Sequence, residues 1–271
     1  MNRLMQWVIA AALICGLNVF SSCSNDDNPV KPADNLAEKI IGKWIMSDMG
    51  GMALPTNQKG VFDFVSATKA YVSASVVGYQ VDLWDEQTEY AVEITGNKAT
   101  LTHQYDENIT LTYEFTVNSI TATEMKADMV ICAIINGQKI ASPEMPIGFK
   151  KVNADYSKDI LGLWECKGLK GGETYNDGND RLEFFEDGTY KYWRKNDAGE
   201  WEEVTTREFQ NYFVDGLFLC TRWKNEGEDE LREWWEIKSL KGDKMQWKAL
   251  RQNEDGSTFV QTMDWEKIEE D

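Results

Sequence analysis

The pentapeptide Ile40-Ile41-Gly42-Lys43-Trp44 returns as Ile160-Leu161-Gly162-Leu163-Trp164, 120 positions further along the chain. Four more blocks are related by the same offset. They are Phe62-Asp63-Phe64 with Leu182-Glu183-Phe184, Gly96 with Gly216, Glu114-Phe115-Thr116-Val117 with Trp234-Trp235-Glu236-Ile237, and Ile120 and Met125 with Leu240 and Met245. Solenoid repeats have periods of roughly 20 to 50 residues. An offset of this length therefore indicates two copies of a whole domain. We therefore predict two tandem domains, residues 36–152 and 153–271.

Within each half, apolar and polar residues alternate over short stretches rich in β-branched and aromatic side chains, which is typical of β-strands. The predicted strands are 61–64, 71–77, 90–94, 100–104, 109–117, 181–185, 189–193, 209–214, 217–223 and 233–237. The clearest turns between them are Asp187-Gly188, Gly96-Asn97, Asp215-Gly216 and Asp255-Gly256. Single helical turns are predicted only at 36–41 and 157–161. We expect each of these turns to cover the entrance of one barrel. The pattern predicts an all-β protein of two up-and-down β-barrels, because closure removes exposed strand edges.

A helical turn, Gly-x-Trp on the first strand, and a strand leading into Asp187-Gly188-Thr189-Tyr190 together resemble lipocalin-like domains of Gram-negative lipoproteins. The second copy matches better than the first, where Ser66-Ala67-Thr68 replaces the Asp-Gly turn. The resemblance implies two tandem lipocalin-like barrels, each enclosing a cup for small apolar molecules. It also implies that the tryptophan packs under a basic residue from the last strand, for which Lys150 or Lys151 and Lys267 are the candidates.

The N-terminus reads as a signal peptide. Arg3 precedes an apolar run from Leu4 to Leu17, which is short for a membrane span, and small residues precede Cys23. Phe20-Ser21-Ser22-Cys23 resembles a bacterial lipobox, which implies that residues 1–22 are removed and that Cys23 carries acyl chains such as palmitate. The alternatives are an ordinary secretory signal or an N-terminal membrane helix. Residues 23–35 are polar and predict a flexible tether.

The amino-acid composition limits which classes of partner the protein can bind. The 271 residues include 46 Asp and Glu against 28 Lys and Arg, a formal net charge of -18. Because phosphate binding needs clustered Lys and Arg, nucleic acid is not an expected partner. Apart from Cys15 in the signal and Cys23, three cysteines remain, so one is left over unless it pairs between chains. Cys166 and Cys220 could form a disulfide, but buried thiols are the commoner outcome in apolar strands.

Catalytic patterns are lacking. His103 is the single histidine, so one chain assembles neither a Ser-His-Asp triad nor a histidine-based metal site. We find no Gly-rich phosphate loop and no Cys-x-x-Cys pair. Two carboxylates could hydrolyse a glycoside, but solvated surface acids account equally well for so many Asp and Glu. We expect no enzyme, no metal and no cofactor.

Aromatic residues give the remaining clue, because eight of the 11 tryptophans lie in the second half. We expect Trp235 to face inward with Phe184, Tyr190 and Tyr192, and Trp193 and Trp234 to face outward, because adjacent strand residues point to opposite sides. Exposed rings can stack on sugars or contact a protein, although they can equally cover one another. In the first half, small side chains are expected to leave an apolar cavity. The predicted ligand-binding residues are Val72, Ala74, Val76, Trp193 and Trp234, with Ala91 also lining the first lumen.

These observations predict a monomeric, lipid-anchored binding protein of the outer membrane, facing the periplasm or the cell surface, for a small apolar molecule or a glycan. Asp26 and Asp27 after Cys23 resemble a surface-export signal, which favours the surface slightly. The alternative is a structural or protein-interaction module with fully packed barrels. Uptake of a fluorescent fatty acid would distinguish the two, because a packed barrel leaves no room for it.

Overall fold

A computed structural model describes residues 35–73, 84, 87–171 and 179–268. It divides into two compact β units, which we call barrel one and barrel two, with the main boundary between Val152 and Asn153. The all-β prediction of two tandem barrels is confirmed. The predicted lipidation site Cys23, the tether up to residue 34, and the predicted ligand-binding residues Ala74 and Val76 lie outside the described residues.

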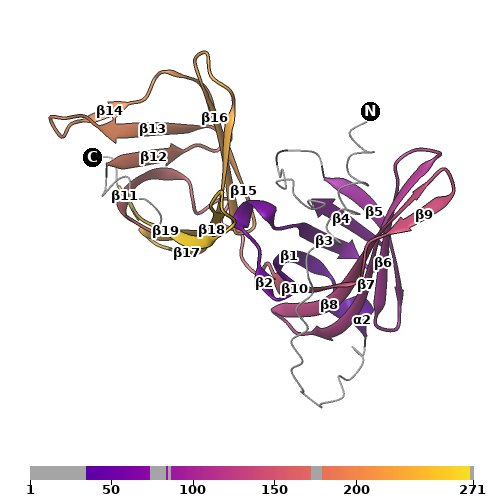
Figure 1. The fold of residues 1–271 in the computed structure, drawn as a ribbon. Coiled ribbons are helices and arrows are strands. Elements are labelled where there is room, and N and C mark those ends of the chain that lie inside the picture. The colour runs from indigo at the N-terminus through magenta and orange to yellow at the C-terminus, as the bar shows by residue number, and fades with distance from the viewer. Residues whose placement is uncertain (1–34, 74–83, 85–86, 172–178, 269–271) are drawn as a thin grey trace. The chain divides into compact units, whose positions relative to one another are not determined.

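Barrel one is a closed ring of antiparallel strands in up-and-down order, because β10 pairs with β1 on one side and with β8 on the other (Figure 1). The strands β2 and β9 extend the sheet outside this ring. In chain order its elements are α2 (Leu36–Lys39), β1 (Gly42–Met49), β2 (Met52–Ala53), β3 (Val61–Ser66), β4 (Lys69–Ser73), β5 (Thr88–Thr95), β6 (Lys98–Gln104), β7 (Ile109–Ile120), β8 (Glu124–Ile135), β9 (Gln138–Ala141) and β10 (Met145–Lys151). The 3₁₀ helix η2 (Thr56–Gln58) follows β2 in the chain, but Pro55–Asn57 are assigned to the second unit.

Barrel two is an antiparallel sheet with the strand order β14-β13-β12-β11-β19-β18-β17-β16-β15. One isolated bridge, Thr189 with Asn211, joins its two ends, next to the hydrogen bond from the Tyr212 amide to the Gly188 carbonyl. Along the rest of β13 and β15 no ladder connects the strands. The strands are β11 (Gly162–Lys170), β12 (Asp180–Phe184), β13 (Tyr190–Lys195), β14 (Trp201–Glu203), β15 (Arg207–Asp215), β16 (Phe218–Asn225), β17 (Leu231–Lys241), β18 (Lys244–Gln252) and β19 (Thr258–Lys267).

The repeated Gly-x-Trp motif forms the base of each barrel. Trp44 and Trp164 are fully buried, and each indole nitrogen donates a 2.6 Å hydrogen bond to the carbonyl of Ile40 or Ile160, four residues earlier. Each strand then has a register shift just after its tryptophan. The tryptophan therefore satisfies its one polar atom locally while its rings fill the barrel end.

A lysine from the last strand lies over each of these tryptophans, as the lipocalin-like resemblance implied. The Lys151 ammonium is 5.0 Å from the Trp44 ring centroid, and the Lys267 ammonium is 5.4 Å from that of Trp164. Gly42 has a φ of +114°, and a Cβ placed there would lie 2.8 Å from the Lys151 side chain. Glycine is needed at this position for both reasons, backbone conformation and close approach.

The predicted turns are confirmed, since Gly96, Gly188, Gly216 and Gly256 all have positive φ. The helical turn predicted at 36–41 is α2, whereas 157–160 is a hydrogen-bonded turn and no helix. It keeps one helix-type bond, from the Ile160 amide to the Tyr156 carbonyl. Cys132, Cys166 and Cys220 are buried thiols, and Cys166 and Cys220 form no disulfide.

Candidate functional site

The polar interior of barrel two is its most distinctive feature. Near the Trp164 end, the inward positions are apolar and belong to one buried cluster that includes Phe184, Trp247 and Trp265. Strand alternation places the following inward positions at the other end of the barrel, where most of them are polar. We call them the distal cluster: Asp180, Tyr190, Tyr192, Arg207, Gln210, Trp223, Glu233, Trp235, Arg251 and Gln261.

Arg207 occupies the side of the cluster where β13 and β15 have no ladder. Its guanidinium carbon lies 4.6 Å from the Tyr192 ring centroid on β13 and 5.0 Å from the Trp223 ring centroid on β16. Its Nη1 donates to the Gln210 side chain at 3.0 Å and to the Tyr190 hydroxyl at 3.4 Å. The arginine therefore connects the two unpaired edges through its side chain, by cation–π contacts and hydrogen bonds.

Arg251 forms the second centre of the distal cluster. Its guanidinium lies 4.4 Å from the Trp235 ring centroid, and its Nη2 is 3.7 Å from a Glu233 carboxylate oxygen. Its Nε donates to the Gln261 side chain at 3.4 Å. Burial lowers the pKa of Arg251 from its ordinary value, and the Glu233 carboxylate opposes that shift. This arginine is thus neutralised within the barrel by a carboxylate of the same cluster.

Asp180 is the other carboxylate of the cluster. It accepts a 2.5 Å hydrogen bond from the Tyr192 hydroxyl, and Arg194 lies 3.8 Å away. Burial, followed by this hydrogen bond to Asp180, raises the pKa of Tyr192. Tyr190 responds to both centres: burial raises its pKa most, Arg207 lowers it, and Glu233 raises it again. Arg207 and Glu233 therefore shift the pKa of the same hydroxyl in opposite directions.

Four buried donors on inward-facing residues of barrel two make no hydrogen bond to the described residues. They are the indole nitrogens of Trp247 and Trp265, Nε of Arg207 and Nη2 of Arg251. Both indoles belong to residues at most 3 % exposed. Buried donors are nearly always satisfied in folded proteins, so the two guanidinium donors, which belong to the distal cluster, suit a molecule that brings acceptor oxygens.

The lumen of barrel one is apolar. Phe62 makes edge-to-face contacts with Tyr113, Phe115 and Phe149 at centroid distances of 5.4, 5.4 and 5.7 Å. Val72 faces inward in this cluster, as predicted, but Ala91 is exposed and lines no lumen. Large rings from β3, β7 and β10 lie in the same buried cluster as Val72.

The predicted outward tryptophans differ in exposure. Trp193 is half-buried on the outer face of β13, paired with Arg181 and Glu203, and the Lys191 ammonium lies 5.8 Å from its ring centroid. Trp234 is only 5 % exposed, so the expectation of an exposed ring is wrong there. Trp234 pairs with the buried Cys220, and neither belongs to the inner cluster that contains Trp235. The predicted inward orientation of Trp235, Phe184 and Tyr190 is confirmed.

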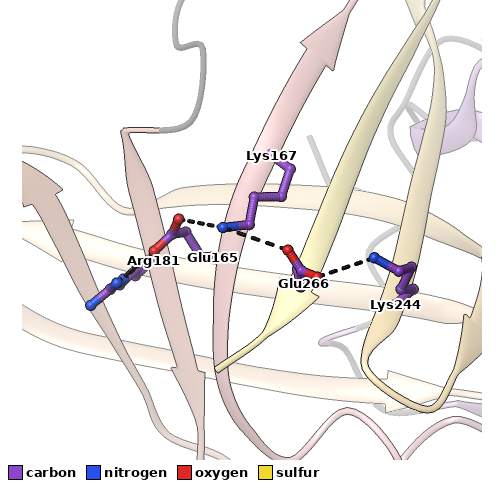
Figure 2. Close-up of polar contacts among 5 residues, drawn as sticks. All are labelled: Glu165, Lys167, Arg181, Lys244 and Glu266. Carbon is purple, nitrogen blue, oxygen red and sulfur yellow. Dashed lines mark hydrogen bonds and ion pairs between the residues drawn. The ribbon is translucent and has the colours of Figure 1, made fainter. Parts of the chain in front are cut away.

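A ladder of ion pairs crosses the outer face of β12, β11, β19 and β18 (Figure 2). Arg181 and Lys167 both contact the Glu165 carboxylate at 2.5 Å, Lys167 also lies 3.6 Å from Glu266, and Lys244 lies 3.1 Å from Glu266. Cation and anion alternate across four neighbouring strands, and each charge has a partner. This arrangement is typical of a solvated strand surface and leaves no charge for a ligand.

His103 has a structural environment in barrel one. Its Nδ1 lies 2.8 Å from the Glu89 carbonyl oxygen, and its ring packs against Tyr90 and Tyr105. Within the described ranges, no group of three or more His, Cys, Asp or Glu side chains is arranged to hold a metal ion. In the same part of the chain, no helix combines the length and hydropathy needed to cross a bilayer.

Sequence reasoning missed Arg207 and Arg251. Both stand at positions of the inward-facing alternation, two residues from Ala249 in the case of Arg251, so the signal was present. A charged residue that lies on the same face of a strand as buried residues indicates a polar barrel interior. The β18 sequence Lys244–Gln252 itself alternates clearly, with Met245, Trp247 and Ala249 buried, yet it was not among the predicted strands.

No protein-family model matches the chain, and no curated protein sequence matches it. Solved structures give weak similarity. A protein of unknown function of the DUF3598 family from Nostoc punctiforme is 8 % identical, with 86 % of this chain and 97 % of that chain covered and a TM-score of 0.25. A mutant of transferrin binding protein B from Haemophilus parasuis is 10 % identical, with coverage of 81 % and 68 % and a TM-score of 0.26. A candidate outer membrane protein from Bacteroides fragilis is 10 % identical, with coverage of 86 % and 99 % and a TM-score of 0.22. Similarity at this level does not bear on function.

Proposed function

We propose that this protein is a lipid-anchored binding protein of the cell envelope whose second barrel binds a glycan or another hydroxylated small molecule at the distal cluster. The observation that carries the proposal is Arg207, held between the Tyr192 and Trp223 rings at the one place where the barrel wall has no strand ladder. Flat rings beside hydrogen-bonding side chains are the groups that recognise sugars, through stacking and directed hydrogen bonds.

The choice between the two barrels rests on their interiors. The aromatic contacts around Phe62 occupy the lumen of barrel one and leave its inward surface apolar. Barrel two supplies carboxylates, amides, hydroxyls and guanidinium groups at inward positions. A hydroxylated ligand therefore matches barrel two, whereas the small apolar molecule expected for barrel one would have to displace packed rings.

Binding, and no catalysis, fits the chemistry of the cluster best. Both of its carboxylates already engage partners, Asp180 with Tyr192 and Glu233 with Arg251. The single histidine belongs to the other barrel. Lipidation at Cys23 would hold the protein at the outer membrane, facing the periplasm or the surface, since several acyl chains anchor a protein stably. We also propose that the protein is a monomer and that it does not bind nucleic acid.

The competing function is a protein-interaction module, and the outer face of β12, β13 and β14 favours it. There Arg181 lies 4.1 Å and Lys195 4.8 Å from the Trp201 ring centroid, next to half-buried Trp193. Aromatic rings with arginine are enriched in protein interfaces. This surface is on the opposite side of the strands from the distal cluster, so a mutation can separate the two sites.

Two tryptophan variants test the proposal. The purified full chain, solubilised in detergent, is titrated with a panel of neutral and acidic oligosaccharides while isothermal heat and tryptophan emission are recorded. We expect Trp223→Ala to weaken binding by about tenfold or more, roughly 1.4 kcal/mol, and Trp193→Ala to leave it unchanged. Loss with Trp193→Ala alone would assign the glycan to the outer face. Absence of binding by the wild-type chain across the panel would overturn the proposal and favour the interaction module.

A further inference from the structure

We propose that the ligand of barrel two carries a carboxylate on a sugar ring, and that Arg207 is the residue that binds this carboxylate. The inference rests on the proposed function and narrows it to acidic sugars. It starts from the way in which the charged groups of the distal cluster are paired with one another.

Within the described part of the chain, each charged group in the cluster except Arg207 has a partner of opposite charge. Glu233 pairs with Arg251 at 3.7 Å, and Asp180 pairs with Arg194 at 3.8 Å while accepting from the Tyr192 hydroxyl. Arg207 contacts only neutral groups among the described residues, namely the Gln210 amide, the Tyr190 hydroxyl and two rings. A half-buried cation without an anion is stabilised most by a ligand that brings one.

The geometry of Arg207 suits a carboxylate in particular. Both of its hydrogen bonds leave from Nη1. The edge formed by Nε and Nη2 makes none to any described residue, and Nε is buried without an acceptor there. That edge presents two parallel N–H donors, which match the two oxygens of a carboxylate. The rings of Tyr192 and Trp223 flank the guanidinium, so a bound carboxylate would bring its sugar ring against them and shift the Trp223 ring.

The rest of the cluster favours a sugar over an alkyl chain as the carrier of that carboxylate. Gln210, Gln261 and the Tyr190 hydroxyl offer donors and acceptors at the same end of the lumen. An alkyl tail placed there would strip these groups of hydrogen bonds, which costs about 1 to 3 kcal/mol for each group left unsatisfied. Hydroxyl groups of a sugar replace those bonds.

The test compares matched ligands. Trigalacturonate carries carboxylates, galactotriose is its neutral counterpart, and hexanoate has a carboxylate without a sugar. Calorimetry on the full chain should show trigalacturonate binding at least tenfold tighter than galactotriose, with hexanoate weaker than both. The preference should shrink as salt rises, since it depends on a charge pair.

Three variants test whether Arg207 causes the preference for the acidic sugar. Arg207→Met should remove the preference for trigalacturonate, and Arg207→Lys, which keeps the charge but loses the paired donors, should retain part of it. Arg232→Met is the matched control, because Arg232 lies on β17 next to Glu233 but on the outer face, where it pairs with Glu230. Near-ultraviolet circular dichroism confirms folding of each variant, and Arg207→Lys serves where Arg207→Met does not fold.

The outcomes separate the two proposals. Equal binding of trigalacturonate and galactotriose would overturn the inference about the carboxylate and leave glycan binding in place. Tighter binding of hexanoate than of trigalacturonate would overturn the sugar as the carrier. An unchanged preference in Arg207→Met would exclude Arg207 as the binding residue. Absence of binding by all three ligands, with glycan binding absent from the wider panel as well, would overturn the proposed function itself.

Discussion

The two barrels share one frame and differ in what fills it. Trp44 and Trp164 make the same hydrogen bond, and each lies beneath a lysine. At the other end, residues 120 positions apart have different chemistry. Barrel one has Val72, Tyr90, His103, Tyr113 and Ile131 where barrel two has Tyr192, Gln210, Trp223, Glu233 and Arg251. The frame therefore depends on the base of the barrel, while the lumen at the far end is free to vary.

One cross-strand pair illustrates the difference. In barrel one, Tyr113 and Ile131 face each other across β7 and β8, and both are buried in the apolar cluster. Burial raises the pKa of Tyr113 to about 12, although a hydrogen bond with Tyr90 opposes the shift. In barrel two, the corresponding positions hold Glu233 and Arg251, an ion pair at 3.7 Å. An apolar contact and an ion pair occupy equivalent places, and only the second offers charges to a ligand.

The largest expected loss of stability comes from substitutions that create a cavity inside each barrel. Phe62→Ala in barrel one and Trp247→Ala in barrel two each remove a ring from a buried cluster, which should lower the free energy of unfolding by about 3 to 5 kcal/mol. Urea denaturation measures the loss, and hydrogen exchange followed by mass spectrometry locates it in one barrel. We expect the cavity of Phe62→Ala to bind an apolar fluorescent probe, and that of Trp247→Ala to bind less of it.

Val65→Ala, a substitution of an exposed side chain on β3, controls for loss of an apolar group without a cavity. Equal uptake of the probe by both cavity variants would contradict the comparison, because it would mean that the polar groups of barrel two do not alter the character of its lumen.

The ion pair gives the next largest effect. Glu233→Gln leaves Arg251 without a compensating charge, and we expect a loss of about 1 to 2 kcal/mol. That is less than for a fully buried pair, because the Glu233 side chain is 45 % exposed and solvent screens it. The double variant Glu233→Leu with Arg251→Met should recover most of the loss in urea denaturation. If the double variant is as unstable as the single one, the pair has no specific role.

Much of the frame could be predicted from local sequence. Gly42 and Gly162 are needed because the backbone there has a positive φ beneath a lysine. Trp44 and Trp164 each donate a hydrogen bond to a carbonyl four residues earlier, so the conformation of the motif is determined largely by neighbouring residues. The Asp-Gly turns are likewise local. The candidate lysines could be narrowed to Lys150 or Lys151 but not resolved, because the choice depends on the register of β10 with β1.

The candidate site depends on non-local pairing and was not predictable in the same way. Arg207 contacts Tyr192 and Trp223 only because β13 and β15 remain unpaired beside it, which no local pattern reveals. Ala91 was placed in the lumen although its strand neighbours Tyr90 and Val92 are the buried ones. A shift by one residue reverses the face of every side chain, so a single register error misassigns a lumen.

A smaller effect tests whether the two frames are equivalent. Lys151→Met and Lys267→Met keep the apolar stem and remove the charge over the tryptophan, so each should cost about 0.5 to 1 kcal/mol. Lys150→Met, at the exposed neighbouring position, is the control. Unfolding in urea, resolved by hydrogen exchange in each barrel, gives both values. A cost confined to one lysine would show that the two bases are held together differently.

The smallest expected effect concerns the ion-pair ladder of Figure 2, which barrel two carries on its outer face. Burial acts to raise the pKa of Glu165, but hydrogen bonds from Lys167 and Arg181 outweigh it, and the pKa lies below its ordinary value. A carboxyl whose pKa is lower in the folded state stabilises the fold above the unfolded pKa, and this contribution disappears as pH falls through the folded pKa. Wild type should therefore exceed Glu165→Gln by about 0.5 kcal/mol at pH 7, a difference that shrinks below about pH 4.5. Urea denaturation at pH 7, 4.5 and 3 measures it, with Glu254→Gln in an exposed turn as the control. A difference that stays constant down to pH 3 would show that Glu165 acts through packing, in which case the charges on this face contribute nothing measurable to the stability of barrel two.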